Sequence, residues 1–281
     1  MSGMLIGAAV AAACSVGCGL MRGRQRGRLR TIQAIRSVTI EELQGLQQGV
    51  AKEIGAGAYT EAVKLQADLV CEQPLVAPFS EEACIAYQSR VVEVFEERVT
   101  STDSEGKSTT SWQRNERSIS SEERRCDFSL HQGNHRIDVD AEGAEIDLVE
   151  IINRMDPGQL SPGRHPAGRQ GAAAGALQLG SAALAAHLNR ADGPSFRFIG
   201  YRQEESIFPA SGSIFVVAEV SDAGGSLRLR QPREGGLFLI RNEGEERLLK
   251  RLQTSIQLWT FGLAGLALIA FVTLILGVFG Y

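Results

Sequence analysis

The last part of the chain is its most apolar segment. Residues 258–279 form a run of 22 residues without a charge, rich in Leu, Ile, Phe and Val. At about 1.5 Å per residue such a helix is roughly 33 Å long, which is enough to cross the hydrocarbon core of a bilayer. Trp259 and Tyr281 lie at its two ends, where aromatic rings favour the membrane interface. The pattern predicts a transmembrane helix over 258–279.

A second uncharged segment, 4–21, lies near the N-terminus and is dominated by Gly and Ala. Small residues recur in it every four positions, at Gly3, Gly7, Ala11, Ser15 and Gly19. Such a stripe allows another transmembrane helix to approach closely. A cleaved signal peptide is the alternative, but no Lys or Arg precedes the apolar run. We therefore expect an uncleaved first transmembrane helix over 4–21.

Cations flank both apolar segments on the side of the middle of the chain. They are Arg22, Arg24, Arg26, Arg28 and Arg30 after the first segment, and Arg247, Lys250 and Arg251 before the second. Cationic flanks remain on the cytoplasmic side of a membrane. We expect these residues to set the topology. The middle of the chain would then lie in the cytoplasm, at a bacterial inner or internal membrane, with both termini across the bilayer.

The region 31–257 between the two segments is patterned mostly as strands. Between Val63 and Cys71 apolar and polar residues alternate, and a period of two predicts a strand with one buried face. Further strand-like runs cover 84–100, 110–119, 126–130, 136–139, 196–207, 213–220, 226–230 and 237–240. The predicted fold class is therefore an α+β membrane protein, in which two transmembrane helices flank a mostly antiparallel, β-rich soluble domain with short helices.

Two helix starts and one internal division can be recognised in this domain. Thr39 and Glu42 have the spacing of a capping box, and Asn242 is expected to cap a last helix that continues without a breaker into the apolar segment. A Pro/Gly/Ala-rich segment, 155–190, divides the domain into two parts, 58–150 and 195–242. We expect a loop at its start and an Ala-rich helix over 172–189.

Composition excludes several classes of protein. The chain has 29 Lys+Arg against 33 Asp+Glu, and this acidic balance argues against a nucleic-acid partner. Its five cysteines are irregularly spaced without a CxxC pair, so neither a disulfide framework nor a four-ligand zinc site is predicted. Cys71 and Cys84 occupy apolar positions of strand patterns and are expected in the core. Trp112 suits either the core or a ligand platform, and we expect the core.

Only one group of residues suggests chemistry. His131 and His135 lie on either side of a Gly133–Asn134 turn, with Cys126 nearby, and imidazole and thiolate are good metal ligands. The alternative is that they are exposed residues of a hairpin. Because no third ligand is placed by spacing, they are weak metal candidates. We expect no catalytic residue, no cofactor and no metal.

One set of residues recurs in a familiar order along most of the chain. It consists of Leu69-Val70-Cys71, Pro74-Leu75, Pro78, Cys84, Tyr87, Trp112, Phe128-Ser129-Leu130, 143–146, 204–207, Gly212, 215–217, 227–232, Leu248-Leu249, Ser255 and Leu258-Trp259. With the two apolar segments around it, this order resembles the GIDE family of membrane-anchored E3 ubiquitin ligases. In that family, as the resemblance implies, transmembrane helices flank a domain beside the membrane and a RING finger follows. Ala218 departs from the pattern, because we expect glycine there.

The resemblance does not extend to the ligase activity that the family owes to its RING. A RING finger needs eight Cys and His ligands for two zinc ions, and we expect no such set among the residues up to Tyr281. The expected function is therefore a membrane-anchored interaction or scaffolding module, with the bilayer and an unidentified membrane protein as partners. One alternative is an accessory of a ubiquitin ligase that acts with a separate RING partner. The other is a metal-dependent enzyme using His131, His135 and Cys126.

Overall fold

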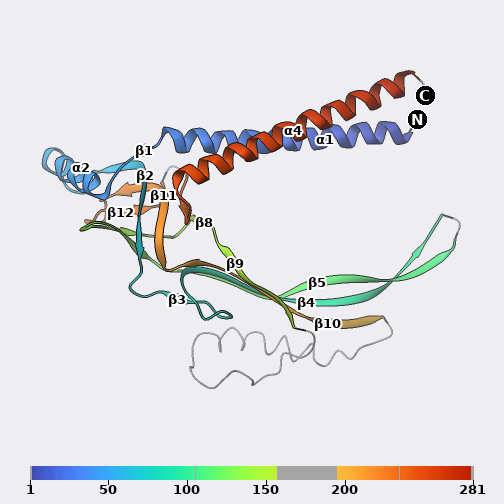
Figure 1. Cartoon of the computed structure of the whole chain (residues 1–281), viewed down its shortest axis with the longest axis horizontal. Coiled ribbons are helices and arrows are strands. Elements are labelled where there is room, and N and C mark those ends of the chain that lie inside the picture. Colours follow the sequence, from blue (N-terminus) through green and yellow to red (C-terminus); the bar gives the residue numbers. More distant parts are fainter. Residues whose placement is uncertain (1, 105, 157–194, 234, 280–281) are drawn as a thin grey trace.

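The computed structural model describes residues 2–104, 106–156, 195–233 and 235–279 (Figure 1). Its helices are α1 (Ser2–Ala34), α2 (Ile40–Glu53) and α4 (Glu245–Phe279). Its strands are β1 (Arg36–Ser37), β2 (Thr60–Val70), β3 (Leu75–Val76), β4 (Ala83–Thr102), β5 (Ser108–Arg125), β6 (Phe128–Gln132), β7 (His135–Val139), β8 (Glu145–Ile146), β9 (Val149–Asp156), β10 (Phe196–Pro209), β11 (Ser211–Ser221), β12 (Arg228–Arg230) and β13 (Leu239–Arg241). The predicted Ala-rich helix over 172–189 lies outside the described residues.

Five strands close into a small barrel. β2 pairs with β6, β6 with β7, β7 with β12, β12 with β11, and β11 returns to β2. All of these pairs are antiparallel except β7–β12, which is parallel. Numbered within the barrel by chain order, the strands follow each other as 1-2-3-5-4-1. This is the arrangement of an OB-type Greek-key barrel.

The alternation along these strands explains why the barrel closes. Leu65 and Leu69 of β2, Leu130 of β6, Val216 of β11 and Leu229 of β12 are all buried in one apolar cluster. Side chains alternate between the two faces along each strand, and all of these residues project to the face that lies inside the barrel. Helix α2 adds the fully buried Ile40 and Leu43 to this cluster. The β-rich domain predicted from the sequence is thereby confirmed.

Two insertions between barrel strands contribute to a second sheet. One insertion, between β2 and β6, supplies β3, β4 and β5, and the other, between β7 and β11, supplies β8, β9 and β10. β10 pairs with both β4 and β9, so both insertions contribute to one antiparallel sheet, whereas β8 pairs with β13 in the sheet of the barrel. Because only Ala210 separates β10 from β11, this sheet continues directly into the barrel.

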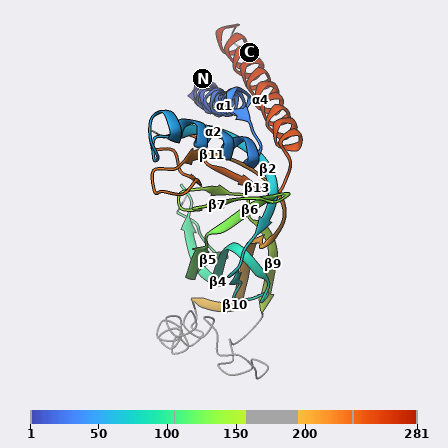
Figure 2. The same ribbon diagram turned by 90° about the vertical axis from the view of Figure 1, so that its left-hand side faces the viewer.

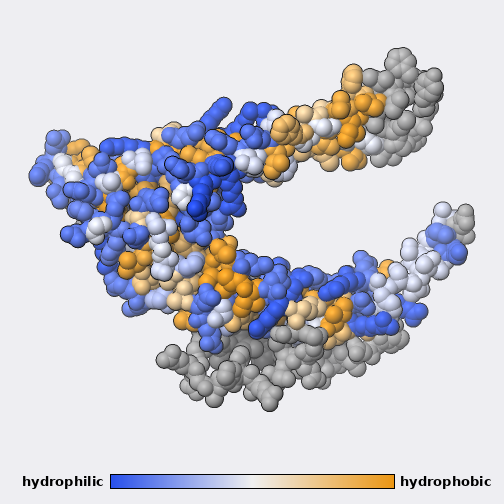
Figure 3. Space-filling model, in the orientation of Figure 1, coloured by the Kyte–Doolittle hydropathy of each residue, from blue (hydrophilic) through white to orange (hydrophobic). Residues whose placement is uncertain are grey.

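The long hairpin of β4 and β5 is extended beyond its sheet. The register pairs β4 with β5 as far as Thr102 and Ser108, whereas β10 begins at Phe196 opposite Glu97. Among the described residues, the part of the hairpin over 98–112 is therefore a two-stranded ribbon without a third strand, which we call the arm. The arm and the helix pair project from the same side of the barrel, with an open hollow between them (Figures 1 and 3).

Helices α1 and α4 lie side by side and run in opposite directions. Both chain ends therefore lie at the same end of the molecule (Figures 1 and 2). Where they meet, a Cβ atom at Gly19 would lie 3.6 Å from Leu263 Cδ1, which is an ordinary van der Waals contact. Helix α1 continues as one element from Ser2 through all five arginines to Ala34.

The predicted arrangement of two membrane spans is wrong. Among the described residues, one helical stretch, Glu245–Ile269 in α4, is long and apolar enough to cross a membrane, and only 6% of its apolar window is buried. The described part of α1 offers no such stretch, because it carries an arginine at every second position from Arg22 to Arg30. The pattern of small residues at its start indicates helix packing instead.

Two helix starts can be compared with their predictions. The capping box at Thr39 is confirmed, since its hydroxyl accepts from the Glu42 amide at 3.2 Å and the Glu42 carboxylate accepts from the Thr39 amide at 2.9 Å. Asn242 is not the cap of α4, which begins later. The carbonyl of Gly244 accepts from the amides of Arg247 and Leu248 instead. Glu245 and Glu246 still lie in the first turn, where they complement the helix dipole.

Candidate functional site

The helix pair is attached to the barrel through an apolar patch on the outer face of β11. Ile214 and Val216 point into the barrel, so their neighbours Phe215 and Val217 point outward. These two side chains are buried against Ile32 of α1 and Leu248 of α4. The helix pair therefore covers a part of the sheet that would otherwise expose large apolar groups to water.

A buried cation contributes to this attachment. Lys64 projects from the outer face of β2 and is only 7% exposed. Its Nζ atom donates to the Ile32 carbonyl oxygen at 3.1 Å and lies 2.5 Å from Glu245 Oε1. One side chain thus joins the end of α1, the barrel and the first residue of α4. We call this attachment of the helix pair to the barrel the joint. Because a buried charge is costly unless paired, removing either contact should loosen it.

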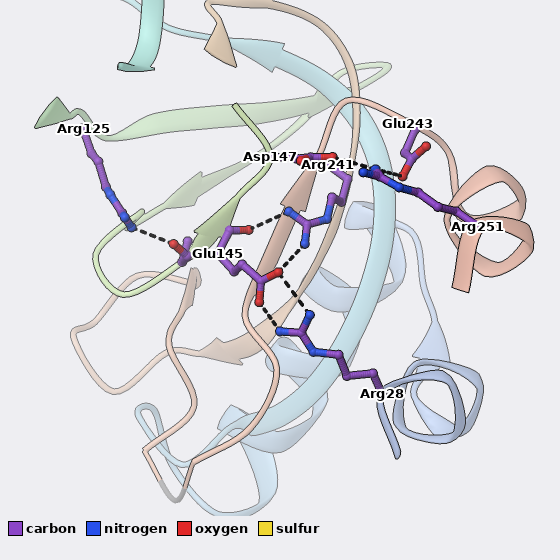
Figure 4. A network of polar contacts seen from close by, with 8 residues as sticks. Arg28, Arg125, Glu145, Asp147, Arg241, Glu243 and Arg251 are labelled. Carbon is purple, nitrogen blue, oxygen red and sulfur yellow. Dashed lines mark hydrogen bonds and ion pairs between the residues drawn. The ribbon is translucent and has the colours of Figure 1, made fainter. Parts of the chain in front are cut away.

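A second ion-pair group surrounds Glu145 on β8 (Figure 4). Arg241 of β13 donates to Glu145 Oε1 at 2.5 Å, and Arg28 of α1 binds the same carboxylate from the other side. Burial disfavours ionisation of Glu145, but the hydrogen bonds from Arg28 and Arg241 outweigh it and hold the pKa of the carboxyl below its usual range. Arg28, expected to set membrane topology, therefore also ties α1 to the barrel.

Helix α4 has a matching contact on its own side. Arg251 Nη1 lies 3.1 Å from Asp147 Oδ2 and 3.3 Å from Glu243 Oε1, and these carboxylates raise its pKa (Figure 4). In the same group Arg125, the last residue of β5, donates to the Ala144 carbonyl oxygen at 2.6 Å. The strand and turn around 144–147 therefore contact both helices and the base of the long hairpin.

The remaining predicted topology residues are six cations along the helix pair, which we call the collar. Since Ile32 packs near Leu248 and Gly19 near Leu263, the arginines of α1 lie beside the polar base of α4. The collar consists of Arg22, Arg24, Arg26, Arg30, Arg247 and Lys250. None of these six forms an ion pair with another described residue.

The collar lies directly before the exposed apolar part of α4. A shallow groove of about 460 Å³ on this helix is lined by Arg247, Lys250, Arg251, Thr254, Ser255 and Leu258. Beyond it, Phe261, Leu268 and Phe271 are each at least 60% exposed. Figure 3 shows the change from hydrophilic to hydrophobic surface along the helix pair. Cations and hydroxyls beside exposed apolar side chains match the chemistry of a lipid headgroup region.

The predicted metal candidates are not brought together. The register pairs His131 with Arg136 and His135 with Gln132, so the two imidazoles project from opposite faces of the hairpin. His135 Nδ1 lies 2.7 Å from Gln44 Oε1, His131 Nε2 lies 3.3 Å from Ser129 Oγ, and Cys126 Sγ contacts Cys71. Among the described residues, no three His, Cys, Asp or Glu side chains are grouped for a metal ion.

The expectation that Trp112 lies in the core is wrong. Its side chain is 36% exposed at the base of the arm, and the Arg197 guanidinium lies over its ring at 4.1 Å from the centroid. On the other face of the same sheet, Phe95 and Phe196 stack with their centroids 5.1 Å apart. Aromatic contacts thus mark the point where the third strand ends and the arm begins.

The open face of the barrel carries a polar groove of about 290 Å³ beside β6, β7 and β12. Its charged lining residues are Glu72, Asp127, Asp138, Asp140, Arg136 and Arg228. Arg136 is bound by Glu72 at 2.8 Å and by Asp138 at 3.2 Å. The acids outnumber the bases, so this face is unfavourable for a phosphate backbone.

The functional side chains that sequence reasoning missed are Lys64, Glu145 and the Cys71–Cys126 pair. The sequence places Lys64 on the polar face of the alternating strand over 63–71 but gives no sign that this cation is buried. Glu145 follows a turn at Gly143, whose φ is 74°, but nothing local reveals its partners on α1 and β13. Such contacts between distant segments depend on the closed barrel.

The fold and the joint define a class of protein: an OB-type barrel that carries a helix pair with one apolar, membrane-compatible helix. Residues 96–277 match the GIDE family, described as E3 Ubiquitin ligase. Since this match covers more than half of the chain, the protein belongs to the GIDE family, as the resemblance indicated. Neither a curated protein nor a solved structure matches the chain.

Proposed function

We propose that this GIDE-family protein is a membrane-anchored interaction module in which α4 is the anchor. The observation that carries the proposal is the single uninterrupted helix from Glu245 to Phe279. Its first turns are fixed to the barrel through Lys64 and Leu248, and its later turns expose Leu, Ile and Phe side chains. One rigid element would thus connect a soluble β domain to the hydrocarbon layer.

The position of the collar along α4 indicates how deeply this anchor would enter the bilayer. If the apolar part of α4 enters the bilayer, Arg247 and Lys250 lie at its surface. Each exposed cation near an anionic surface contributes up to about 1 kcal/mol. Anionic phospholipid is therefore the lipid partner that the charges favour.

The barrel and the arm are the surfaces offered to a protein partner. The arm has a free edge at β5 among the described residues, and its surface is polar with Trp112 exposed. Free strand edges bind extended peptides by adding a strand. Anchoring confines the module and its membrane partner to the same bilayer surface. This raises their effective concentration for each other. The acidic groove on β6 and β7 supports the expectation that nucleic acid is not a partner.

Anchoring is tested by washing membranes that contain the full chain with alkaline carbonate. The wild-type protein should stay in the pellet. Substituting both Leu268→Arg and Ile269→Arg should release it, because each buried arginine costs about 3 kcal/mol on the insertion scale. Leu46→Arg on the exposed side of α2 is the matched control and should not release it. Wild-type protein in the supernatant would contradict the proposal.

A second candidate is a role in ubiquitin transfer, favoured by the family description E3 Ubiquitin ligase. The chain would then act as part of a ligase, with or without a separate RING protein. The test is a ubiquitination assay with activating and conjugating enzymes, with the chain present or omitted. Formation of ubiquitin conjugates that depends on the chain supports this role. The same conjugates without it exclude the role in that assay.

A further inference from the structure

Two free thiols face each other at the base of the long hairpin. Cys71 directly follows β2 and Cys126 directly follows β5, so the pair brackets the whole insertion that contains β3, β4 and β5. Their Sγ atoms lie 3.7 Å apart, although 55 positions separate the residues in sequence. Both side chains are half-buried.

The contact is specific to these two cysteines. Cys71 Sγ also lies 3.7 Å from the Asp127 carbonyl oxygen, and the Cys126 amide donates to the Ile85 carbonyl oxygen at 2.9 Å. The backbone on both sides of the pair is thus held by the barrel and by β4. Cys84 is fully buried nearby, where its thiol donates to the Leu75 carbonyl oxygen at 3.7 Å.

We propose that Cys71 and Cys126 are a reversible thiol pair that forms a disulfide and thereby closes the base of the β3–β5 insertion. An S–S bond is about 2.05 Å long, so the two sulfurs must approach by rotation of their side chains. The backbone beside both residues is already held, by β2 before Cys71 and by the hydrogen bond from the Cys126 amide to Ile85. The inference does not depend on membrane anchoring.

The oxidant that this step requires is a low-molecular-weight disulfide. The Cys71 thiolate attacks one of its sulfurs, forms a mixed disulfide and releases one small thiol. The Cys126 thiol then loses its proton and attacks Cys71 Sγ, which forms the protein disulfide and releases the second small thiol. Two protein thiols are oxidised and one small disulfide is reduced, so electrons and protons balance.

This order of attack follows from the surroundings of the two thiols. Burial, together with the hydrogen bond to Cys71, raises the pKa of Cys126 to about 12. Cys126 is therefore assigned the second, intramolecular step, where proximity compensates for its low thiolate fraction. Burial likewise raises the pKa of Cys84 to about 11 and leaves it no part in the exchange.

The test is incubation of the full chain with oxidised glutathione, followed by alkylation of the remaining thiols and peptide mass spectrometry. Cys14→Ser and Cys18→Ser remove the two helix thiols. We expect one crosslinked peptide pair that joins Cys71 to Cys126, while Cys84 is alkylated after denaturation. The crosslink should vanish in Cys71→Ser and in Cys126→Ser but persist in Cys84→Ser. Dithiothreitol should reverse it.

Thermal unfolding provides a second readout on the same samples. Since the bond closes a long loop, the oxidised protein should unfold at a temperature higher by roughly 5 °C than the reduced protein. The Cys126→Ala variant should show no such shift after the same treatment. Glutathione retained on Cys71 without a crosslink, or a crosslink that includes Cys84, would overturn the proposal.

Discussion

Lys64 of β2 and Glu245, the first residue of α4, form an ion pair whose Nζ–Oε1 distance is 2.5 Å. The side chain of Lys64 is 9% exposed and that of Glu245 is 28% exposed, so the pair lies at the edge of the apolar patch under the helices. This contact fixes the direction in which α4 leaves the barrel. The attachment of the helix to the domain therefore depends on a polar contact as well as on Leu248.

We predict that Lys64→Met lowers the free energy of unfolding by about 2 kcal/mol, because Glu245 and the Ile32 carbonyl lose their charged donor. A double-mutant cycle with Glu245→Gln isolates the pair, and the coupling should exceed about 0.5 kcal/mol. Urea unfolding followed by circular dichroism measures both. Lys52→Met, on the exposed side of α2, should change little. Additive effects of the two substitutions would show that the pair does not hold the joint.

Glu145 should make the joint sensitive to acid. Its pKa is held below the usual range, so its contribution is fully present above about pH 4.3, the pKa of an unfolded glutamate, and is lost as pH falls through the folded pKa. Because the side chain is 43% exposed, we expect only about 1 kcal/mol. The unfolding midpoint of Glu145→Gln should therefore be lower at pH 7 and closer to wild type at pH 3. An equal difference at both pH values would contradict this assignment.

The sequence revealed the strands with one buried face far better than those without one. Leu65 and Leu69 alternate with polar residues, and the strand predicted over 63–71 covers β2 except for its first three residues. The strand predicted over 110–119 ends six residues early, because β5 continues to Arg125. Residues 120–125 are polar on both faces, and only pairing with the residues of β4 makes them a strand.

The closure of the barrel and the contacts of the joint could not be predicted from local sequence patterns, for a different reason. The parallel pairing of β7 with β12 joins segments separated by the entire second insertion, and no local pattern specifies it. The same holds for Arg28, which appeared as one of five similar arginines until Glu145 was placed opposite it. The two-span prediction failed because the described part of α1 carries an arginine at every second position from Arg22 to Arg30, so no described stretch of this helix is apolar enough.

The arm should be dispensable for folding. Residues 99–111 extend past the last pairing with β10 and lack a third strand, and isolated two-stranded ribbons add little stability. Replacing 99–111 by Asn-Gly should change the unfolding temperature by less than about 2 °C. Crosslinking to membrane partners should be lost if the arm is their binding surface. As a comparison, Glu93→Ala removes a buried carboxylate bound by Arg117 and should destabilise the protein clearly.

The collar predicts a preference for anionic lipid. In nanodiscs of mixed phosphatidylglycerol and phosphatidylcholine, the protein should enrich phosphatidylglycerol, as native mass spectrometry of bound lipids can measure. Removing two charges with Arg247→Gln and Lys250→Gln should lower this enrichment by roughly tenfold, because each cation contributes up to about 1 kcal/mol.

The matched control removes two charges from the barrel side of the protein, with Lys52→Gln and Arg233→Gln. It should leave the lipid composition unchanged. If both double variants reduce the enrichment equally, net charge rather than the collar determines it. If neither does, the collar does not contact headgroups.

The central claim, that α4 enters the bilayer, is tested most directly by quenching of single tryptophans with brominated lipids. The chain has two tryptophans, so Trp112→Phe leaves Trp259 alone and Trp259→Phe leaves Trp112 alone. Adding Leu268→Trp to a chain without either gives a third probe. We predict no quenching at 112, quenching by bromine near the headgroup at 259, and quenching by bromine deep in the acyl chain at 268. A tryptophan at 268 that is as unquenched as Trp112 would contradict the account.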